Sequence, residues 1–395
     1  MNDFIWKISL YRFLDAIKLV GVIFTLLFAH NGLSIFQISL LISIWSLTQL
    51  VLEVPLGAIA DKYPRRNLLI LALLALALGL AFWLQGGFVF YAVGFVFWGF
   101  KNAMTSGTYE AFVYDELKTM GKESLYEQIN GKLEGARWLG VALSAVLGGI
   151  VATISYQLVL IFSIITTLLA ICALLTITSV RPQKSTDEVR YLEVLKSAVR
   201  DIRTNTSLLG IIVFLSLLFS TYGAVDEYWG LIYQSLKLPV AAVGILVAIG
   251  YGSFSLAGST LSFFNSKIMV GREHLILCVS ACLFILAGLF HSYISLPFIF
   301  LGLYFFKVAN LKLDAKFQHA IRADQRATIS SLKSLIFEIF YIGFVLLFGI
   351  ISSKLGIPSM LYVLGILFIF GILLFRIFFP IALQRILAIK NPDNA

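Results

Sequence analysis

Charged residues are scarce in this sequence. Asp, Glu, Lys and Arg together make up 13% of the 395 residues, about half the share of a soluble domain. Hydrophobic residues make up 59%, which excludes an ordinary soluble domain and favours a chain that crosses a membrane several times. The net charge of +9 then indicates basic residues in cytoplasmic loops, and we expect no nucleic-acid partner.

Cysteine and histidine are also rare, with three and four residues. The cysteines lie inside apolar runs and the histidines are scattered, so neither type has the spacing of metal ligands: Cys172, Cys278, Cys282, His30, His274, His291 and His319. We expect neither a metal nor another cofactor. The sequence also lacks a Gly-x-Ser-x-Gly motif, a His-Glu-x-x-His motif and an ATP-binding Gly-x-x-x-x-Gly-Lys-Ser/Thr loop. It therefore favours neither an enzyme nor an ATP-driven pump.

Long apolar runs are abundant, and about twelve of them approach the roughly 20 residues that a membrane helix needs. Their approximate limits are residues 4–29, 36–60, 67–87, 89–115, 125–152, 156–180, 207–233, 240–266, 273–291, 294–320, 326–352 and 357–380. The first run contains Arg12, Asp15 and Lys18, so we interpret it as a retained span rather than a cleaved signal peptide.

Basic residues in the connections alternate between two sides of the membrane. One side holds most of them, and the other holds only Lys237 and Lys354. The basic side is therefore the cytoplasm, with both termini there, in a bacterial-type inner membrane. The long polar connection 181–206 has apolar residues at helical spacing and predicts an amphipathic cytoplasmic helix. It separates six-span halves at 1–180 and 207–395, an organisation typical of transporters built from repeats.

A charge in the bilayer core costs several kcal/mol, so a buried charge should line a polar pathway. The third, sixth and ninth spans carry none at depth and should face lipid. We expect substrate or proton handling by the charges placed near the midplane: Asp15, Lys18, Lys101, Lys307 and Glu338. Asp226 and Glu227 lie toward the outer mouth. The charges of the cytoplasmic half should form structural pairs: Arg12, Glu53, Glu110, Glu134 and Arg137.

Some of these pairs can form within one helix. Asp15 can pair with Arg12 or Lys18, and Glu134 with Arg137, at a spacing of three residues. Lys101 and Lys307 have no acidic neighbour in their own helix turn.

The stretch "GAIADKYPRR", residues 57–66, combines a glycine, an acid and three basic residues. Gly57 would allow another helix to approach. Asp61 could accept from helix N-terminal amides, and Lys62, Arg65 and Arg66 would lie at the headgroups. The stretch resembles the signature between spans 2 and 3 of the major facilitator superfamily, with Pro64 in place of its second glycine. The resemblance implies an all-α fold of about twelve transmembrane helices, alternating access, and a cytoplasmic latch at these residues.

Glycines recur in the fifth span, where small residues would allow close helix packing. Their spacing resembles the antiporter signature of the same superfamily: Gly131, Gly140, Gly148 and Gly149. Ser144 and Ala145 replace the Gly-Pro pair of that signature. Upstream, Ser124 and Glu127 fit a capping box.

The stretch "SGTYEAFVYDEL", residues 106–117, resembles a bacterial efflux-like branch of the superfamily. In it Glu110 and Tyr114 share a helix face and could form a protonatable pair. Asp115 and Glu116 should cap a helix at headgroup level.

Together these features predict a secondary transporter, a monomer in lipid, that exports a small molecule in exchange for protons. Glu338 and Asp15 are the first candidates for the proton carrier, with Glu110 third and Asp226 and Glu227 as an outer gate. The solute stays open. An acidic aromatic cavity would suit multidrug cations, whereas four lysines favour an anionic or zwitterionic metabolite or a siderophore, moved in either direction: Lys18, Lys101, Lys307 and Lys333. A lipid flippase is a further alternative.

Overall fold

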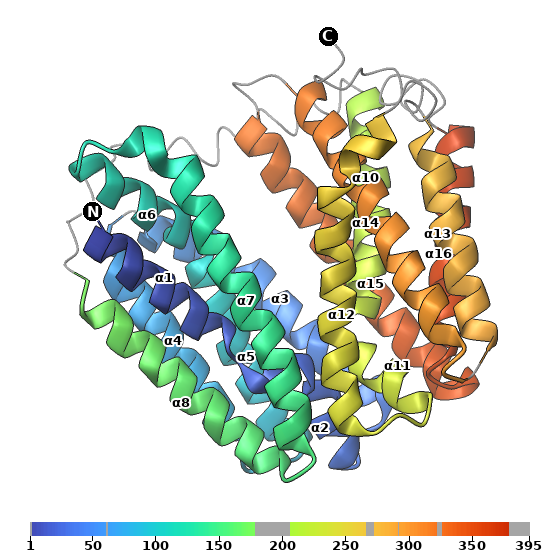
Figure 1. The fold of residues 1–395 in the computed structure, drawn as a ribbon, viewed down its shortest axis with the longest axis horizontal. Coiled ribbons are helices and arrows are strands. Elements are labelled where there is room, and N and C mark those ends of the chain that lie inside the picture. Colours follow the sequence, from blue (N-terminus) through green and yellow to red (C-terminus); the bar gives the residue numbers. More distant parts are fainter. Residues whose placement is uncertain are drawn as a thin grey trace. The chain divides into compact units, whose positions relative to one another are not determined.

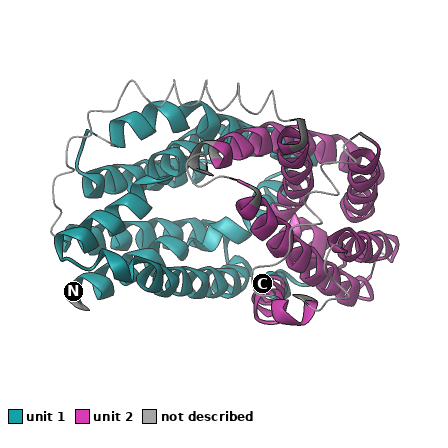
Figure 2. Cartoon of the chain, turned by 90° about the horizontal axis from the view of Figure 1, so that it is seen from above, with its two compact units in different colours: residues 1–188, 239–248 teal, residues 189–238, 249–395 magenta. Residues whose placement is uncertain are grey.

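The computed structural model describes residues 2–60, 62–177, 206–265, 272–290, 292–321 and 326–378. Within these ranges every regular element is a helix, as expected for an all-α protein. Nine of the described helices are long and apolar enough to cross a membrane. The chain divides into two compact units, residues 1–188 with 239–248 and residues 189–238 with 249–395 (Figure 2). The amphipathic helix predicted in 181–206 lies outside the described residues, and the predicted domain limits remain a prediction.

The first unit contains most of the helices in the first half of the chain (Figure 1). Their bounds are α1 Asn2–Ala16, η1 Leu19–Val22, α2 Phe24–His30, α3 Ile35–Ala60, α4 Arg65–Trp83, α5 Phe88–Thr105, α6 Thr108–Thr119, η2 Glu123–Leu125, α7 Tyr126–Ala152 and α8 Tyr156–Leu175. Helix α1 packs against α7 and α8, and α4 packs against α5 and α8. Leu71, Leu74 and Leu78 are exposed along one face of α4, as expected for a helix that faces lipid.

The second unit contains the remaining helices, with α12 divided between the two units. Their bounds are α10 Thr206–Asp226, α11 Trp229–Ser235, α12 Val240–Ser259, η3 Leu261–Asn265, α13 Glu273–Leu289, α14 Ser295–Ala320, α15 Arg326–Leu355 and α16 Ser359–Phe378. Helix α10 packs against α15 and α16, and α13 packs against α14 and α16. Buried rings join these helices, with Phe306 stacked on Tyr222 at 4.3 Å and on Phe368 at 5.3 Å between ring centroids.

Four spans predicted as continuous helices are broken. The span 4–29 is interrupted after α1 and again before α2, and the span 89–115 is interrupted at Gly107. The span 207–233 is interrupted between α10 and α11, and the span 240–266 between α12 and η3. Gly107 has a φ of 71°, a backbone conformation that glycine adopts readily. The continuous prediction was wrong because hydropathy follows side chains, and the apolar runs continue across each interruption.

Two local expectations for the stretch from α6 to the start of α7 were also wrong. Helix α7 begins after Leu125 with no side-chain cap, so Ser124 and Glu127 form no capping box there. The short helix η2 occupies the residues that the box would need. Glu116 is not a headgroup-level cap, because α6 turns it inward and leaves it only 4% exposed.

Candidate functional site

Side chains of α8 form hydrogen bonds with main-chain groups at the break that follows α1. The hydroxyl of Thr166 donates to the carbonyl of Ile17 at 2.5 Å, and the backbone N–H of Val20 donates to Ser163 Oγ at 3.0 Å. Both groups would otherwise lose their helical partners inside the membrane. A broken helix is tolerated in a bilayer only when such groups are satisfied by neighbouring side chains or water. The sequence analysis did not identify Ser163 or Thr166 as functional.

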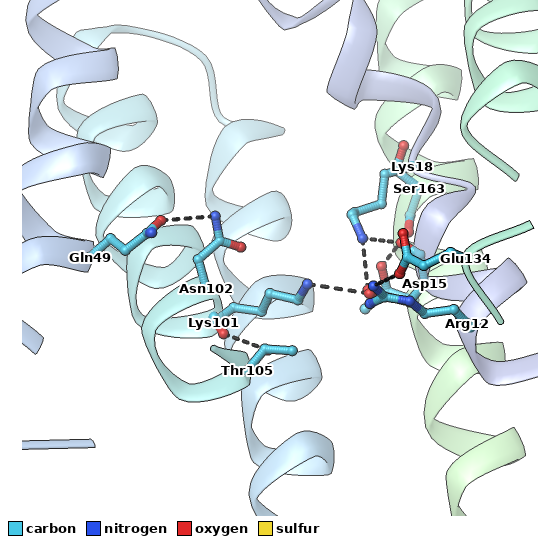
Figure 3. Close-up of polar contacts among 10 residues, drawn as sticks. Arg12, Asp15, Lys18, Gln49, Lys101, Asn102, Thr105, Glu134 and Ser163 are labelled. Carbon is cyan, nitrogen blue, oxygen red and sulfur yellow. Dashed lines mark hydrogen bonds and ion pairs between the residues drawn. The ribbon is translucent and has the colours of Figure 1, made fainter. Parts of the chain in front are cut away.

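Asp15 lies directly before this break and contacts two lysines. Its Oδ1 lies 2.7 Å from Lys18 Nζ and its Oδ2 lies 3.3 Å from Lys101 Nζ. The Lys18 amine also donates to the Asp15 carbonyl, a group exposed by the end of the helix. Figure 3 shows Lys101 of α5 and Lys18 of the break after α1 reaching the carboxylate. The structure thus brings together three of the predicted midplane residues.

This arrangement gives Lys101 an acidic partner from another helix. The lysine has no acid in its own helix turn, but α1 supplies one across the unit. Asp15 and Lys101 are 6% and 7% exposed. Two ammonium groups therefore share one buried carboxylate. Separating such a carboxylate from its cations is costly in free energy, because removing one partner of a buried pair leaves an uncompensated charge.

A second charged cluster lies beside the first in the same unit. Arg12 Nη2 donates to Glu134 Oε1 at 2.6 Å, and Arg137 Nε donates to Glu134 Oε2 at 2.8 Å. The guanidinium of Arg12 also lies over the ring of Tyr109, with 4.2 Å between Cζ and the ring centroid. The expected pair of Glu134 with Arg137 is present, whereas Arg12 pairs with Glu134 and not with Asp15. Each cluster contains two cations and one carboxylate.

The break between α10 and α11 carries two neighbouring carboxylates with a different set of partners. Asp226 Oδ1 accepts from the Tyr222 hydroxyl at 2.7 Å and from Trp229 Nε1 at 3.0 Å. Glu227 Oε1 accepts from the hydroxyl of Tyr341 in α15 at 3.2 Å. In the described part of the second unit, neither carboxylate forms an ion pair.

Three further predicted residues lie in α14 and α15 of the same unit. Lys333 pairs with Asp314 at 2.6 Å between Nζ and Oδ1. Lys307 lies over the ring of Phe254, with 5.2 Å between Nζ and the ring centroid. Glu338 is close enough to Glu227 for their negative charges to repel. Within the second unit, Glu338 therefore lies near Glu227.

A fully buried cluster in the second unit was missed by the sequence analysis. Glu273, at the start of α13, is 0% exposed, and Lys312 and Lys316 of α14 are 2% and 1% exposed. Lys316 Nζ lies 2.8 Å from Glu273 Oε1, and Lys312 Nζ lies 3.9 Å from the same oxygen. The spacing of Lys312 and Lys316 places both on one helix face, which is the only signal of this cluster in the sequence.

The predicted latch residues are partly described. Asp61 lies outside the described residues. Arg65 forms an ion pair with Asp115 of α6, and Arg66 Nη1 donates to the Ile177 carbonyl at 2.6 Å. Lys62 also has a polar partner. Within the described part of the first unit, no other helix closely approaches Gly57, because no atom outside its own helix backbone lies within 4 Å of a Cβ built there.

The glycines of α7 differ from one another. A Cβ on Gly140 would lie 2.7 Å from the Phe13 carbonyl oxygen, and one on Gly148 would lie 2.5 Å from that of Leu19. Gly149 meets the part of α12 that belongs to the first unit, with Gly244 Cα 3.0 Å from its built Cβ. The expected close packing is thus present at three positions. At Gly131 no described atom lies within 4 Å.

The remaining candidates lie away from these clusters. Glu110 is exposed near the start of α6, and no contact joins it to Tyr114, whose ring packs against Tyr126. Among the described residues, no three His, Cys, Asp or Glu side chains are grouped as metal ligands would be. A cavity of about 830 Å³ opens in the first unit between the ends of α2, α4, α7 and α8, and its lining is neutral apart from His30.

A helical membrane protein with charged groups at broken spans has the architecture of a secondary transporter. The chain belongs to the major facilitator superfamily, because the family model of that description matches residues 12–339. It is a multi-pass membrane protein with the fold of this family, about twelve transmembrane helices in two halves. No curated protein matches the chain in sequence.

Solved structures with the same fold are distant in sequence. A mutant of the nucleoside transporter NupG has a TM-score of 0.80 at 14% identity, covering 94% of this chain and 99% of its own. A D-xylose–proton symporter has a TM-score of 0.70 at 12% identity, covering 94% and 96%. A bacterial homologue of the human lysosomal transporter Spinster has a TM-score of 0.69 at 14% identity, covering 97% and 95%. At these identities the likeness establishes the fold alone.

Proposed function

We propose that this transporter is a proton-coupled secondary carrier of a small organic solute. We further propose that the carboxylates at the α10–α11 break, rather than Asp15, bind the coupling proton. One observation carries this proposal: Asp226 and Glu227 accept hydrogen bonds from the neutral donors Tyr222, Trp229 and Tyr341. Such carboxylates can exchange a proton without first breaking an ion pair.

Asp15 is less suited to this role. A proton on Asp15 would have to displace Lys18 and Lys101 and leave two buried ammonium groups without a counter-charge. Glu227, in contrast, has a second carboxylate next to it in the sequence and a third, Glu338, within electrostatic reach. Acidic groups gathered in a desolvated region cannot all remain charged, which favours a shared proton. This revises the expected order of carriers, which began with Glu338 and Asp15.

Export, in exchange for protons, is the direction that the glycine spacing of α7 favours. An anionic or zwitterionic solute is favoured by the excess of positive charge in the two charged clusters of the first unit. Together these clusters contain four cations and two carboxylates: Arg12, Lys18, Lys101 and Arg137, with Asp15 and Glu134. We also propose that both termini lie at the cytoplasmic face of a bacterial-type inner membrane, because the basic loops lie on that side, and that the protein acts as a monomer.

The test uses the full chain in liposomes that enclose a pH-sensitive dye. Organic anions and lipophilic cations are added one at a time, and a solute that moves protons only in the presence of the protein is selected. We expect Glu227→Gln to abolish proton movement while exchange of the solute itself continues. Glu123→Gln, an exposed acid in η2, is the matched control and should behave as the wild type.

Intact proton movement in the Glu227→Gln protein, together with its loss in Asp15→Asn, would return the carrier role to Asp15. If no solute moves protons although solute exchange occurs, the proton-coupled function is wrong.

A further inference from the structure

Lys307 differs from the other buried or half-buried lysines in the described spans. Lys18 and Lys101 contact Asp15, Lys333 contacts Asp314, and Lys312 and Lys316 contact Glu273. Lys307 lies near the middle of α14 and forms neither a hydrogen bond nor an ion pair with any described residue of the second unit. Its amine lies over the ring of Phe254.

The nearest acids act on Lys307 only from a distance. Asp226 and Asp314 attract its charge without contacting it. Asp314 is already paired with Lys333, and Asp226 already accepts from Tyr222 and Trp229. Among the described residues of the second unit, Lys307 therefore has no neighbouring counter-ion available without breaking another interaction.

An unpaired ammonium group in the middle of a membrane helix is costly, by at least about 2.5–3.5 kcal/mol on insertion scales. Packing alone would be served better by an apolar side chain of similar volume, since even buried ion pairs are often replaced by apolar residues without loss of stability. The position therefore favours a role in which the missing negative charge comes from outside the protein.

The ring beneath this amine belongs to a group of aromatic side chains. The ring of Phe254 lies 5.9 Å from that of Tyr222 and 6.3 Å from that of Tyr251, centroid to centroid, and Tyr222 stacks on Phe306. Phe254 and Tyr251 are only half-buried, so part of each ring can meet a ligand. Aromatic pairs in edge or offset geometry contribute about 0.5–1.5 kcal/mol beyond the area that they bury.

We propose that Lys307 and Phe254 bind an aromatic organic anion, whose carboxylate pairs with the Lys307 amine and whose ring packs on Phe254. This inference rests on the proposed transport function and names the class of solute for it. It also selects Lys307 among the four lysines that the sequence suggests as anion ligands, because Lys18, Lys101 and Lys333 already pair with carboxylates.

The test measures binding, not transport. Purified full-length protein in detergent is titrated with 4-fluorobenzoate and followed by fluorine NMR. We expect Lys307→Gln to weaken binding by about tenfold or more, equivalent to about 1.4 kcal/mol, and Lys307→Arg to retain it. Phe254→Leu should weaken binding of 4-fluorobenzoate more than that of trifluoroacetate, a carboxylate without a ring. Lys354→Gln removes an exposed lysine at the end of α15 and serves as the control.

The proposal is overturned if the wild type does not bind 4-fluorobenzoate, if Lys307→Gln binds it equally well, or if benzylammonium binds in its place. Should Lys307→Gln fail to fold, Phe254→Leu and Lys307→Arg still decide the question, because the first must lower and the second must keep the affinity. Binding without proton-driven transport would leave this site in place and refute the proposed coupling. Proton-coupled transport of another solute, without 4-fluorobenzoate binding, would refute only this site.

Discussion

Asp15→Asn should destabilise the protein more than any other single neutralisation in the first unit. At an effective dielectric constant of about 20, the distances of 2.7 Å to Lys18 and 3.3 Å to Lys101 correspond to gross attractions of about 6 and about 5 kcal/mol. Desolvation and the repulsion between the two lysines offset much of this. Breaking a buried charge pair costs about 3–5 kcal/mol net, and we expect a loss in that range.

Lys101→Gln provides the informative comparison. Its removal leaves Asp15 paired with Lys18 at 2.7 Å and takes away the surplus positive charge, so we expect a loss of only about 1 kcal/mol. Asp226→Asn is the matched control for loss of a carboxylate charge. Its neighbours Tyr222 and Trp229 are neutral donors that can still donate to an amide oxygen, so its cost should also be about 1 kcal/mol.

The assay is unfolding by SDS in mixed micelles, which gives a free energy of unfolding for each variant under the same conditions. Thermal midpoints are less suitable because membrane proteins often unfold irreversibly and the midpoint then depends on the scan rate. If Asp15→Asn is as stable as Lys101→Gln, the carboxylate does not hold both lysines, and the argument from a shared buried charge is refuted.

Two further variants test how the first unit is packed. Gly140→Val should lower the free energy of unfolding by about 1–3 kcal/mol, because a Cβ there already meets backbone atoms of α1; Gly131→Val, which has open space, should not, and equal losses would contradict the packing argument. The double variant Ser163→Ala with Thr166→Val should speed amide hydrogen exchange at the α1 break, because main-chain groups there lose their partners. Ser43→Ala, which removes a bond within its own helix, should leave exchange at that break unchanged.

The spans were predictable because the bilayer imposes a strong rule. Each crossing must be a helix with internal hydrogen bonds and an apolar surface, so hydropathy and length locate it. The predicted span 36–60 corresponds closely to α3, Ile35–Ala60. The interruption after α1 could not be predicted in this way, because the groups that stabilise it, Ser163 and Thr166, lie more than 140 positions away in the sequence.

The charged sites were predictable only where both partners share a helix. Glu134 with Arg137 and Asp15 with Lys18 are separated by three residues and were correctly anticipated. The bond from Lys101 to Asp15 spans 86 positions, and a single sequence does not show which distant helices are neighbours. For that reason Lys101 and Lys307 looked alike in the sequence and differ in the structure.

The broken first spans of the two halves contrast in the partners of their carboxylates. At the α1 break, Asp15 is held by two ammonium groups, so its charge stabilises the fold and changes only at high cost. At the α10–α11 break, Asp226 and Glu227 are held by hydroxyl and indole donors, so their charge can change while the donors stay in place. Neutralising Asp15 should therefore mainly lower stability, whereas neutralising Glu227 should mainly affect proton coupling. If neutralising Asp15 mainly affects proton coupling and neutralising Glu227 mainly lowers stability, the proton is carried by Asp15 at the α1 break.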